Sequence, residues 1–382
     1  MVNSIKEKLN IDSKPLIILT GPTAVGKTDL SIKLAKALDG EIVSADSAQV
    51  YKGLDIGSAK VTEEEMQGVP HHLIDVYEPD FSFDVTVFKE AAKKAVEKIY
   101  SRGRIPIIVG GTGFYIQALL YDISFDESEE TGEYLADFEE EIRKQGASGE
   151  TFREVLENYV ALFNTKSDNT NNLSDIKKLS DTNNLNNIHD TNENKALDVL
   201  YSKLTEIDSD STKVIHKNNY RKVIRALEFY HFYGEPISAH NSREREKSSA
   251  YNSFYFVLNM NRDRLYERIN KRVDIMMNNG LVEEVKQLKE QGLTRDMTSM
   301  QAIGYKEIYD ALEIGGSMEE AAEQIKLNTR HFAKRQLTWF RREKDVIWLD
   351  RDEFSSNYTL SSDETDDNIL KFIINKIETT SR

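Results

Sequence analysis

The chain contains no cysteine, and this absence excludes disulfide bonds, thiolate metal sites and a cysteine nucleophile. Histidine is also scarce, with 7 residues, and for the neighbouring pair His71 and His72 we expect a turn after Pro70 rather than a metal site. No apolar run approaches the ~18 residues that cross a bilayer, and the N-terminal residues lack the apolar core of a signal peptide. These absences lead us to expect a cytoplasmic protein without a membrane partner.

Positive charge is in deficit, because 50 Lys and Arg residues stand against 65 Asp and Glu residues, a net charge of −15. This balance argues against a nucleic-acid partner, but such binding depends on local basic patches rather than on the total. Two basic groups occur, namely Lys213, Lys217, Arg221, Lys222 and Arg225, and Lys326, Arg330, Lys334, Arg335, Arg341, Arg342 and Lys344. Arg221 and Arg225 lie four residues apart on one helix face, as do Arg330 and Lys334, and either pair alone is compatible with a solvated helix face. Two basic helices in an otherwise acidic chain, however, favour a nucleic-acid phosphate backbone as the partner.

A phosphate-binding loop is the most informative motif that the chain does contain. A G-x-x-x-x-G-K-T pattern follows the apolar run 16–19 and precedes a helical pattern over 27–38; it consists of Gly21, Pro22, Thr23, Ala24, Val25, Gly26, Lys27 and Thr28. The glycines let backbone N–H groups and the helix N-terminus point at phosphate oxygens. The lysine adds a charge for the outer phosphates, and the Thr28 hydroxyl is placed to bind Mg²⁺. The motif therefore predicts a diphosphate or triphosphate ligand with Mg²⁺ as the metal.

Strand and helix patterns alternate along the first part of the chain and predict an α/β fold. The expected strands are 16–20, 41–46, 72–76 and 105–110, and the expected helices are 27–38 and 84–101, the latter capped by Asp84. Such alternation predicts a mostly parallel, P-loop NTPase-like sheet with flanking helices and a ligand at the carboxyl ends of the strands. Lys27, Asp46 and Thr112 all follow strands closely, which is why we expect them in one site.

The remaining chain predicts an inserted all-helical domain and a second part of the core. Residues 1–120 form the first part of the core, 121–204 the helical insertion, 205–350 the second part with helices that contact nucleic acid, and 351–382 a C-terminal tail. Within the insertion, about 164–194 is rich in Asn, Asp, Ser and Thr, and this composition predicts a loop or disorder. Later patterns predict strands at 253–260 and 346–349 and helices at 261–278, 281–291, 317–342 and 366–376.

Several further motifs occur in a fixed order with the phosphate loop. They are Asp46-Ser47-Ala48-Gln49 with the residues up to Lys60, then 68–75, Gly110-Gly111-Thr112-Gly113, Arg221-Lys222-Val223-Ile224-Arg225, 302–307 and 330–336. Together with the loop they resemble the tRNA dimethylallyltransferases, also called tRNA isopentenyltransferases or the IPP transferase family. The resemblance covers most of residues 15–120 and 200–350 and fails over about 145–195.

The resemblance implies an activity and a set of site residues. It implies transfer of a dimethylallyl group from dimethylallyl diphosphate to N6 of adenosine 37, in tRNAs that read codons starting with U. It assigns the catalytic roles to Asp46 as the base, Thr112 in the reaction channel, Arg225 beside the diphosphate, and Lys27. It assigns tRNA contacts to Asp46, Ser47, Ala48, Gln49, Thr112, Arg221, Lys222, Val223, Ile224 and Arg225. A monomer that binds an anticodon stem-loop is expected.

The residues alone leave alternatives open. Phosphate-loop proteins commonly cleave a triphosphate, so a small-molecule or nucleotide kinase is the alternative function. Asp46 is either a general base, a structural cap or an outer ligand of Mg²⁺. Tyr305 and Trp339 are candidates for stacking on bases, but core packing is the favoured interpretation for each.

Overall fold

A computed structural model describes residues 13–123, 132–164, 193–355 and 361–380. The chain divides into two compact units, one made of Met1–Ile123 and Ser248–Arg382 and the other of Ser124–Lys247. Most of the predicted Asn-rich loop, and part of the acidic run near residue 130, lie outside the described residues. In the described ranges, each helix is too short or too polar to span a bilayer.

The first unit is built on a six-stranded sheet with the order β3-β2-β4-β1-β5-β6, in which every neighbouring pair is parallel. The predicted α/β class with a parallel sheet is confirmed. The strands are β1 Pro15–Thr20, β2 Gly40–Ala45, β3 His71–His72, β4 Ile105–Gly110, β5 Asn252–Asn259 and β6 Val346–Asp350. All six residues of β1 are buried, as expected for a strand covered on both faces. The strand predicted at 72–76 was wrong in its extent, because only two residues there pair with β2.

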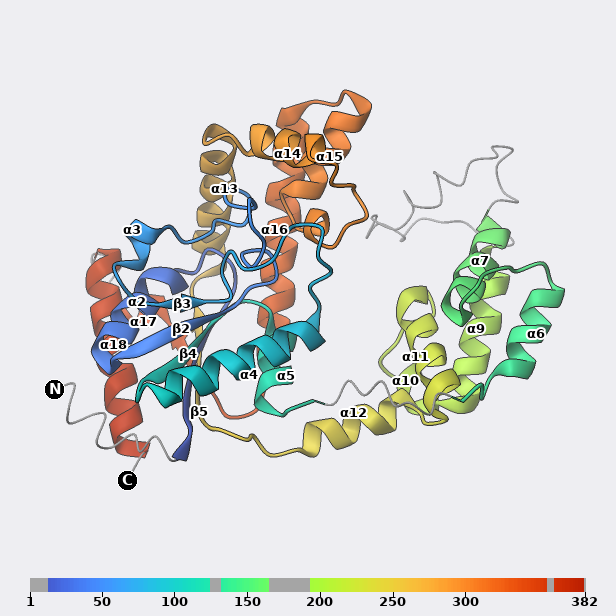
Figure 1. The fold of residues 1–382 in the computed structure, drawn as a ribbon, viewed down its shortest axis with the longest axis horizontal. Helices are drawn as coiled ribbons and strands as arrows, with labels where there is room; N and C mark the ends of the chain where they lie inside the picture. Colours follow the sequence, from blue (N-terminus) through green and yellow to red (C-terminus); the bar gives the residue numbers. More distant parts are fainter. Residues whose placement is uncertain (1–12, 124–131, 165–192, 356–360, 381–382) are drawn as a thin grey trace. The chain divides into compact units, whose positions relative to one another are not determined.

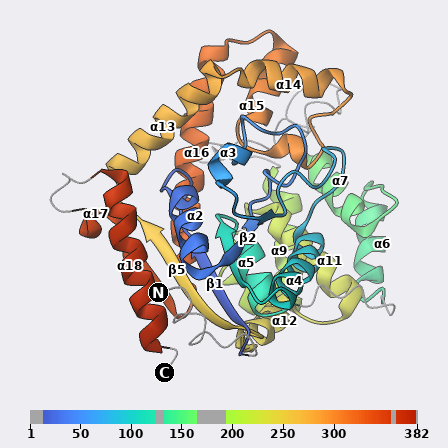
Figure 2. The same ribbon diagram turned by 60° about the vertical axis from the view of Figure 1, so that its left-hand side comes forward.

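Helices cover both faces of this sheet (Figures 1 and 2). One face packs against α4 (Val85–Ser101) and α5 (Gly113–Leu120), and the other against α2 (Lys27–Leu38) and α18 (Ser362–Thr380). Asp84 accepts a hydrogen bond from Val87 N at 2.9 Å, so the predicted cap of α4 is confirmed. The other elements of this unit are α3 Glu63–Met66, α13 Arg262–Asn278, α14 Leu281–Glu290, η3 Ser299–Gln301, α15 Tyr305–Ile314, α16 Met318–Phe340 and α17 Arg351–Phe354.

The second unit is all-helical in its described residues. Its helices are α6 Ala136–Lys144, α7 Phe152–Asn164, α9 Glu193–Ile207, α10 Ser209–Thr212, α11 Tyr220–Tyr233 and α12 Ile237–Glu246. The core of this unit includes Leu156, Leu200 and Leu227 from three different helices. The predicted return to the α/β core at residue 205 was wrong, because α11 packs on α7 and α9 and the boundary falls after Lys247.

Candidate active site

The phosphate loop connects β1 to α2 and takes a conformation that depends on its glycines. Gly21 has φ of +143° and Gly26 has φ of +95°, values that side chains rarely permit. A Cβ atom on Gly21 would also lie 2.5 Å from the Leu258 carbonyl oxygen of β5. The loop is therefore shaped by backbone freedom and by close contact with the neighbouring strand.

Lys27 begins α2 and folds back over the loop. Its Nζ donates to the carbonyl oxygens of Gly21 and Pro22, both at 2.9 Å. Burial lowers the pKa of Lys27 to about 8, although the carboxylate of Asp46 opposes this shift and the guanidinium of Arg272 adds to it. The lysine is thus a cation whose charge is disfavoured until an anion arrives.

Asp46 follows the last residue of β2 and is partly buried. Its Oδ1 accepts hydrogen bonds from Ala48 N at 2.9 Å and from Gln49 N at 3.3 Å. Within the described part of the chain, Oδ2 accepts no hydrogen bond. One oxygen holds the turn, as the capping interpretation expects, while the other keeps its lone pairs available to a substrate proton.

Thr112 follows β4 and is hydrogen-bonded to the backbone of Ala45, the residue before Asp46. Thr112 N donates to Ala45 O at 3.2 Å, and the Thr112 hydroxyl makes no capping bond to α5. The flanking glycines permit this approach, since an added Cβ would lie 2.2 Å from Ala45 O at Gly110 and 2.3 Å from the Trp339 ring at Gly113. Because β4 lies between β2 and β1, the loop, Asp46 and Thr112 meet at one edge of the sheet.

Gln336 of α16 joins two parts of this edge, and the sequence motifs did not assign it a role. Its Oε1 accepts from Thr23 N and its Nε2 donates to Gly111 O, each at 2.9 Å. Its side chain is buried, at 5% exposure. Gln336 thereby fixes the phosphate loop against the turn that carries Thr112. Its position in the 330–336 motif was the available signal, but its partners are hundreds of residues away.

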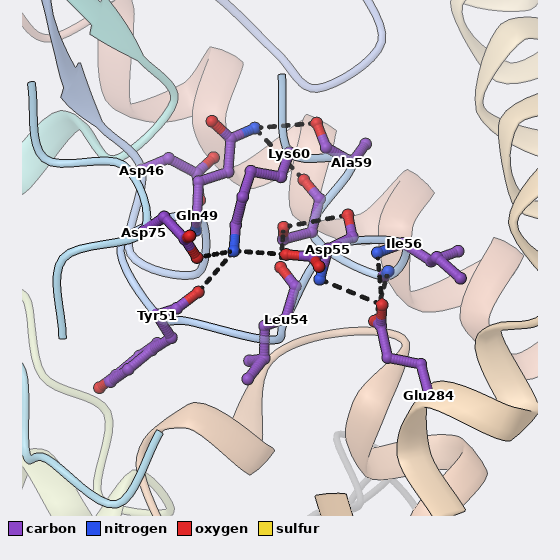
Figure 3. Close-up of polar contacts among 12 residues, drawn as sticks. Asp46, Gln49, Tyr51, Leu54, Asp55, Ile56, Ala59, Lys60, Asp75 and Glu284 are labelled. Atoms are coloured by element: carbon purple, nitrogen blue, oxygen red, sulfur yellow. Dashed lines mark hydrogen bonds and ion pairs between the residues drawn. The ribbon is translucent and has the colours of Figure 1, made fainter. Parts of the chain in front are cut away.

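The segment after Asp46 is held rigidly by side chains (Figure 3). Gln49 Nε2 donates to Ser58 O at 3.3 Å and to Ala59 O at 3.1 Å. Lys60, only 9% exposed, donates to Tyr51 O and to the carboxylates of Asp55 and Asp75. With its Nε2 engaged, Gln49 presents its amide oxygen as the group left to accept a bond.

Glu284 of α14 binds the backbone of the same segment at residues 55–57. Its carboxylate accepts N–H bonds from Asp55 at 3.1 Å, Ile56 at 2.7 Å and Gly57 at 3.2 Å. Tyr305 donates to the same carboxylate at 2.6 Å and is fully buried. Core packing, the favoured interpretation of Tyr305, is confirmed. Trp339 likewise packs against Gly113 and, edge to face, against Phe114.

The residues of α11 that are predicted to contact tRNA belong to the helical unit, and some of them are exposed while others are buried. The side chains of Arg221, Lys222 and Arg225 are exposed. Val223 and Ile224 are each 2% exposed and pack in the core of the unit, so their side chains are not available to RNA in this structure. A tRNA contact at these two positions stays a prediction and would have to use the backbone. Helical periodicity explains the difference, because the apolar positions of the motif face inward. The placement of Arg225 beside a diphosphate stays a prediction.

Part of each basic group is neutralised by carboxylates. Lys213 pairs with Asp210 at 2.6 Å and Lys217 pairs with Asp198 at 3.1 Å. Lys326 pairs with Asp274 at 2.7 Å and with Glu323 at 2.8 Å. Within these two groups, the exposed cations that make no ion pair to the described residues are Arg221, Lys222, Arg225, Lys334, Arg335, Arg341, Arg342 and Lys344.

The two neighbouring histidines have structural partners. His72 Nε2 lies 2.7 Å from Glu41 Oε2, and His71 Nδ1 lies 2.8 Å from Val69 O. The Glu41 carboxylate is also bound by Arg102 and Arg104, and these partners lower its pKa against the effect of burial. This cluster anchors β2 to its neighbours.

The loop residues fit a magnesium ion that is bound together with a polyphosphate. Thr28 lies exposed in the first turn of α2, and its hydroxyl makes no hydrogen bond within the described residues. The described residues contain no group of three or more His, Asp or Glu side chains that could hold a metal alone. A divalent ion here therefore needs phosphate oxygens to complete its coordination, as Mg²⁺ sites commonly do.

The parallel sheet and its glycine loop place the chain among P-loop NTPase-like α/β proteins. The family model described as IPP transferase matches residues 49–172 and 152–343. A tRNA dimethylallyltransferase of Lachnoclostridium phytofermentans is 47% identical over 347 residues, covering 91% of this chain and 95% of the relative.

Solved structures agree. The full-length tRNA isopentenylpyrophosphate transferase of Bacillus halodurans matches with a TM-score of 0.61 at 38% identity, covering 96% of this chain and 98% of that one. A eukaryotic dimethylallyltransferase acting on tRNA matches with a TM-score of 0.65 at 28% identity, covering 95% and 80%. The chain therefore belongs to the IPP transferase family, and the alternative of a kinase is not supported.

Proposed function

We propose that the protein transfers a dimethylallyl group from dimethylallyl diphosphate to N6 of adenosine 37 in tRNAs that read codons starting with U. Transfer of a dimethylallyl group to tRNA follows from family membership. The nature of the donor, the position and the codon class are our proposal. The observation that carries it is the meeting of the phosphate loop, Asp46 and Thr112 at the ends of three adjacent strands.

The leaving group is the first chemical task of the site. The C1–O bond of the donor breaks, C1 forms a bond to N6, and inorganic diphosphate departs with the electron pair. Lys27 and the loop amides neutralise charge that develops on the diphosphate oxygens. Mg²⁺, held by Thr28 and phosphate oxygens, would supply further positive charge to the leaving group.

The proton is the second task. Adenine N6 becomes acidic only as its bond to C1 forms, so a carboxylate of ordinary basicity suffices. Asp46 Oδ2 is the acceptor that we propose, since Oδ1 is committed to the turn. Asp46 is fixed by that turn and Thr112 by its backbone bond to Ala45, and this fixes the geometry before the substrate arrives.

The tRNA contacts follow from the same reaction. A base in an anticodon loop is drawn out at low cost because it lies outside a duplex. We propose that Asp46 to Gln49 bind the extruded adenine and that exposed cations of α11 and α16 bind the RNA backbone. A cytoplasmic monomer stays our expectation.

The experiment is a transfer assay with dimethylallyl diphosphate, Mg²⁺ and an RNA anticodon stem-loop that carries adenosine at position 37. We expect a prenylated stem-loop and one diphosphate per transfer, with no ATP consumed. A stem-loop with guanosine at position 37 is the control. Phosphoryl transfer from ATP without prenylated RNA would overturn the proposal.

A further inference from the structure

Helix α13 places a row of arginines beside the phosphate loop. Its apolar residues Leu265, Ile269 and Val273 are buried in the core. Arg268 Nε donates to Ala24 O within the loop at 2.8 Å, and a Cβ on Gly26 would lie 3.7 Å from Arg268 Nη2. One side of α13 therefore contacts the loop, and Arg272 lies one turn further along that side.

The cations around the phosphate loop differ in whether they already have hydrogen-bond or ion-pair partners. Lys27 binds two loop carbonyls, Arg268 binds Ala24 O, and Arg351 pairs with Asp366 at 2.6 Å. Arg272 is partly buried and makes no hydrogen bond or ion pair within the described residues. A guanidinium that is held partly out of water without a partner is available to an anion that arrives from outside.

The charged groups that affect Arg272 indicate which anion it would bind. Burial lowers the pKa of Arg272; the carboxylate of Asp46 raises it, the guanidinium of Arg268 lowers it, and Glu65 raises it. The same guanidinium lowers the pKa of Lys27. Arg272 thus lies within electrostatic reach of both the loop lysine and the proposed base. Each cation disfavours the charged form of the other, and an anion that binds to both removes this cost.

We propose that Arg272 binds the diphosphate of the prenyl donor together with Lys27 and the loop amides. This assignment rests on the proposed donor. A guanidinium presents paired N–H donors that match two phosphate oxygens, which a lysine cannot reproduce. Because diphosphate gains charge as the C1–O bond breaks, Arg272 also stabilises the transition state.

The test measures binding of inorganic pyrophosphate with Mg²⁺ by calorimetry to the full-length protein and to Arg272→Gln, Arg272→Lys and Lys271→Gln. Hydrogen bonds to charged groups contribute enough that we expect Arg272→Gln to weaken binding by about 10- to 100-fold. Arg272→Lys should recover only part of this loss. Lys271→Gln removes the same charge from the exposed neighbouring position and should stay within about twofold, as an exposed charge contributes little.

Two further measurements separate the explanations. Thermal unfolding of Arg272→Gln should occur at or above the wild-type temperature, because the removed charge is disfavoured in the ligand-free protein. The affinity of this variant for the anticodon stem-loop alone should be unchanged. Lys27→Ala serves as the positive control for loss of diphosphate binding. If Lys27→Ala loses pyrophosphate while folded Arg272→Gln keeps it, or loses RNA affinity instead, the assignment is overturned and the proposed function stands. Failure of the wild type to bind pyrophosphate overturns both.

Discussion

At the scale of single residues, the site separates the roles of the two oxygens of Asp46. Oδ1 is bonded to backbone N–H groups and stabilises the turn, whereas Oδ2 is the oxygen proposed to accept the adenine proton. To test the chemical role of Asp46, a substitution must therefore remove its basicity and keep the hydrogen bonds that hold the turn.

Asp46→Asn keeps a carbonyl oxygen for the turn and removes the basic carboxylate. We expect the single-turnover rate of prenyl transfer to fall by about 10²–10⁴-fold, the range for a lost general base. The affinity for the stem-loop RNA should change far less. Rapid-quench kinetics and fluorescence anisotropy measure the two quantities. A near-normal rate in this variant would show that Asp46 is structural and that another group takes the proton.

Lys27 introduces a pH dependence, because its pKa in the folded protein is about 8 instead of 10.5. The ammonium is charged below this pKa and neutral above it. We therefore expect the affinity for dimethylallyl diphosphate to fall as the pH rises through about 8, by at most about tenfold per pH unit. Calorimetric titrations from pH 6.5 to 9.5 measure this, and Lys27→Ala should lack the transition.

The same lowered pKa gives the stability of the ligand-free protein a pH dependence opposite to that of the ligand affinity. Between about pH 8 and 10.5 the unfolded chain holds the Lys27 proton more tightly than the folded one. This residue's contribution to stability therefore rises with pH across that window. Diphosphate reverses the preference by stabilising the charged form.

At the scale of elements, Glu284 shows how a helix fixes a loop that contains part of the site. Its carboxylate is the partner of three consecutive N–H groups at Asp55, Ile56 and Gly57. These groups lie in the segment that also bonds Gln49, so the order of the proposed adenine contacts depends on α14.

Glu284→Ala leaves these N–H groups without their acceptor. We expect the free energy of unfolding to fall by about 1–3 kcal/mol, since Ile56 and Gly57 are partly buried. Glu283→Ala is the matched control. Glu283 is exposed and, among the residues that the structure describes, pairs only with Lys286 at 3.4 Å, so a change within about 0.5 kcal/mol is expected. Urea unfolding followed by tryptophan fluorescence reports on this unit, because Trp339 and Trp348 both belong to it. Equal effects from the two variants would contradict the role of Glu284.

Most element boundaries could be predicted because they depend on neighbours in sequence. The predicted helix at 27–38 and strand at 105–110 coincide with α2 and β4. The helix α15 at Tyr305–Ile314 was not predicted, and α18 is longer than the expected 366–376. Their ends depend on packing against other elements, which a local pattern does not contain.

At the scale of the whole molecule, the net charge of −15 coexists with exposed cations on α11 and α16. Carboxylates neutralise several lysines of both groups, so the surface left for RNA is smaller than the sequence indicates. An acidic protein can still bind RNA tightly if the remaining cations face its phosphates.

RNA binding should therefore depend steeply on salt. Each phosphate contact contributes a slope of about −0.7 to −0.9 in a plot of log K against log salt concentration. Removing the charge of Arg221, Lys222 or Arg341 should each flatten the slope by about one unit. Lys376, exposed on α18, is the matched control and should leave it unchanged. Filter binding of the stem-loop between 50 and 300 mM salt measures these slopes; equal effects at Lys376 would place the RNA elsewhere.

The sequence by itself determined the α/β class, the phosphate loop and the residues that follow the strands, because strand–loop–helix patterns and caps act over a few residues. The tertiary structure alone decided which distant groups meet. Gln336 joins Thr23 to Gly111 at one edge of the sheet, and Val223 and Ile224 are buried in the core of the helical unit. Arg272, one turn after the Arg268 that contacts the phosphate loop, makes no hydrogen bond or ion pair within the described residues. These contacts depend on how the helices pack against the sheet and one another, and burial depends on the same packing. No local pattern of residues encodes either.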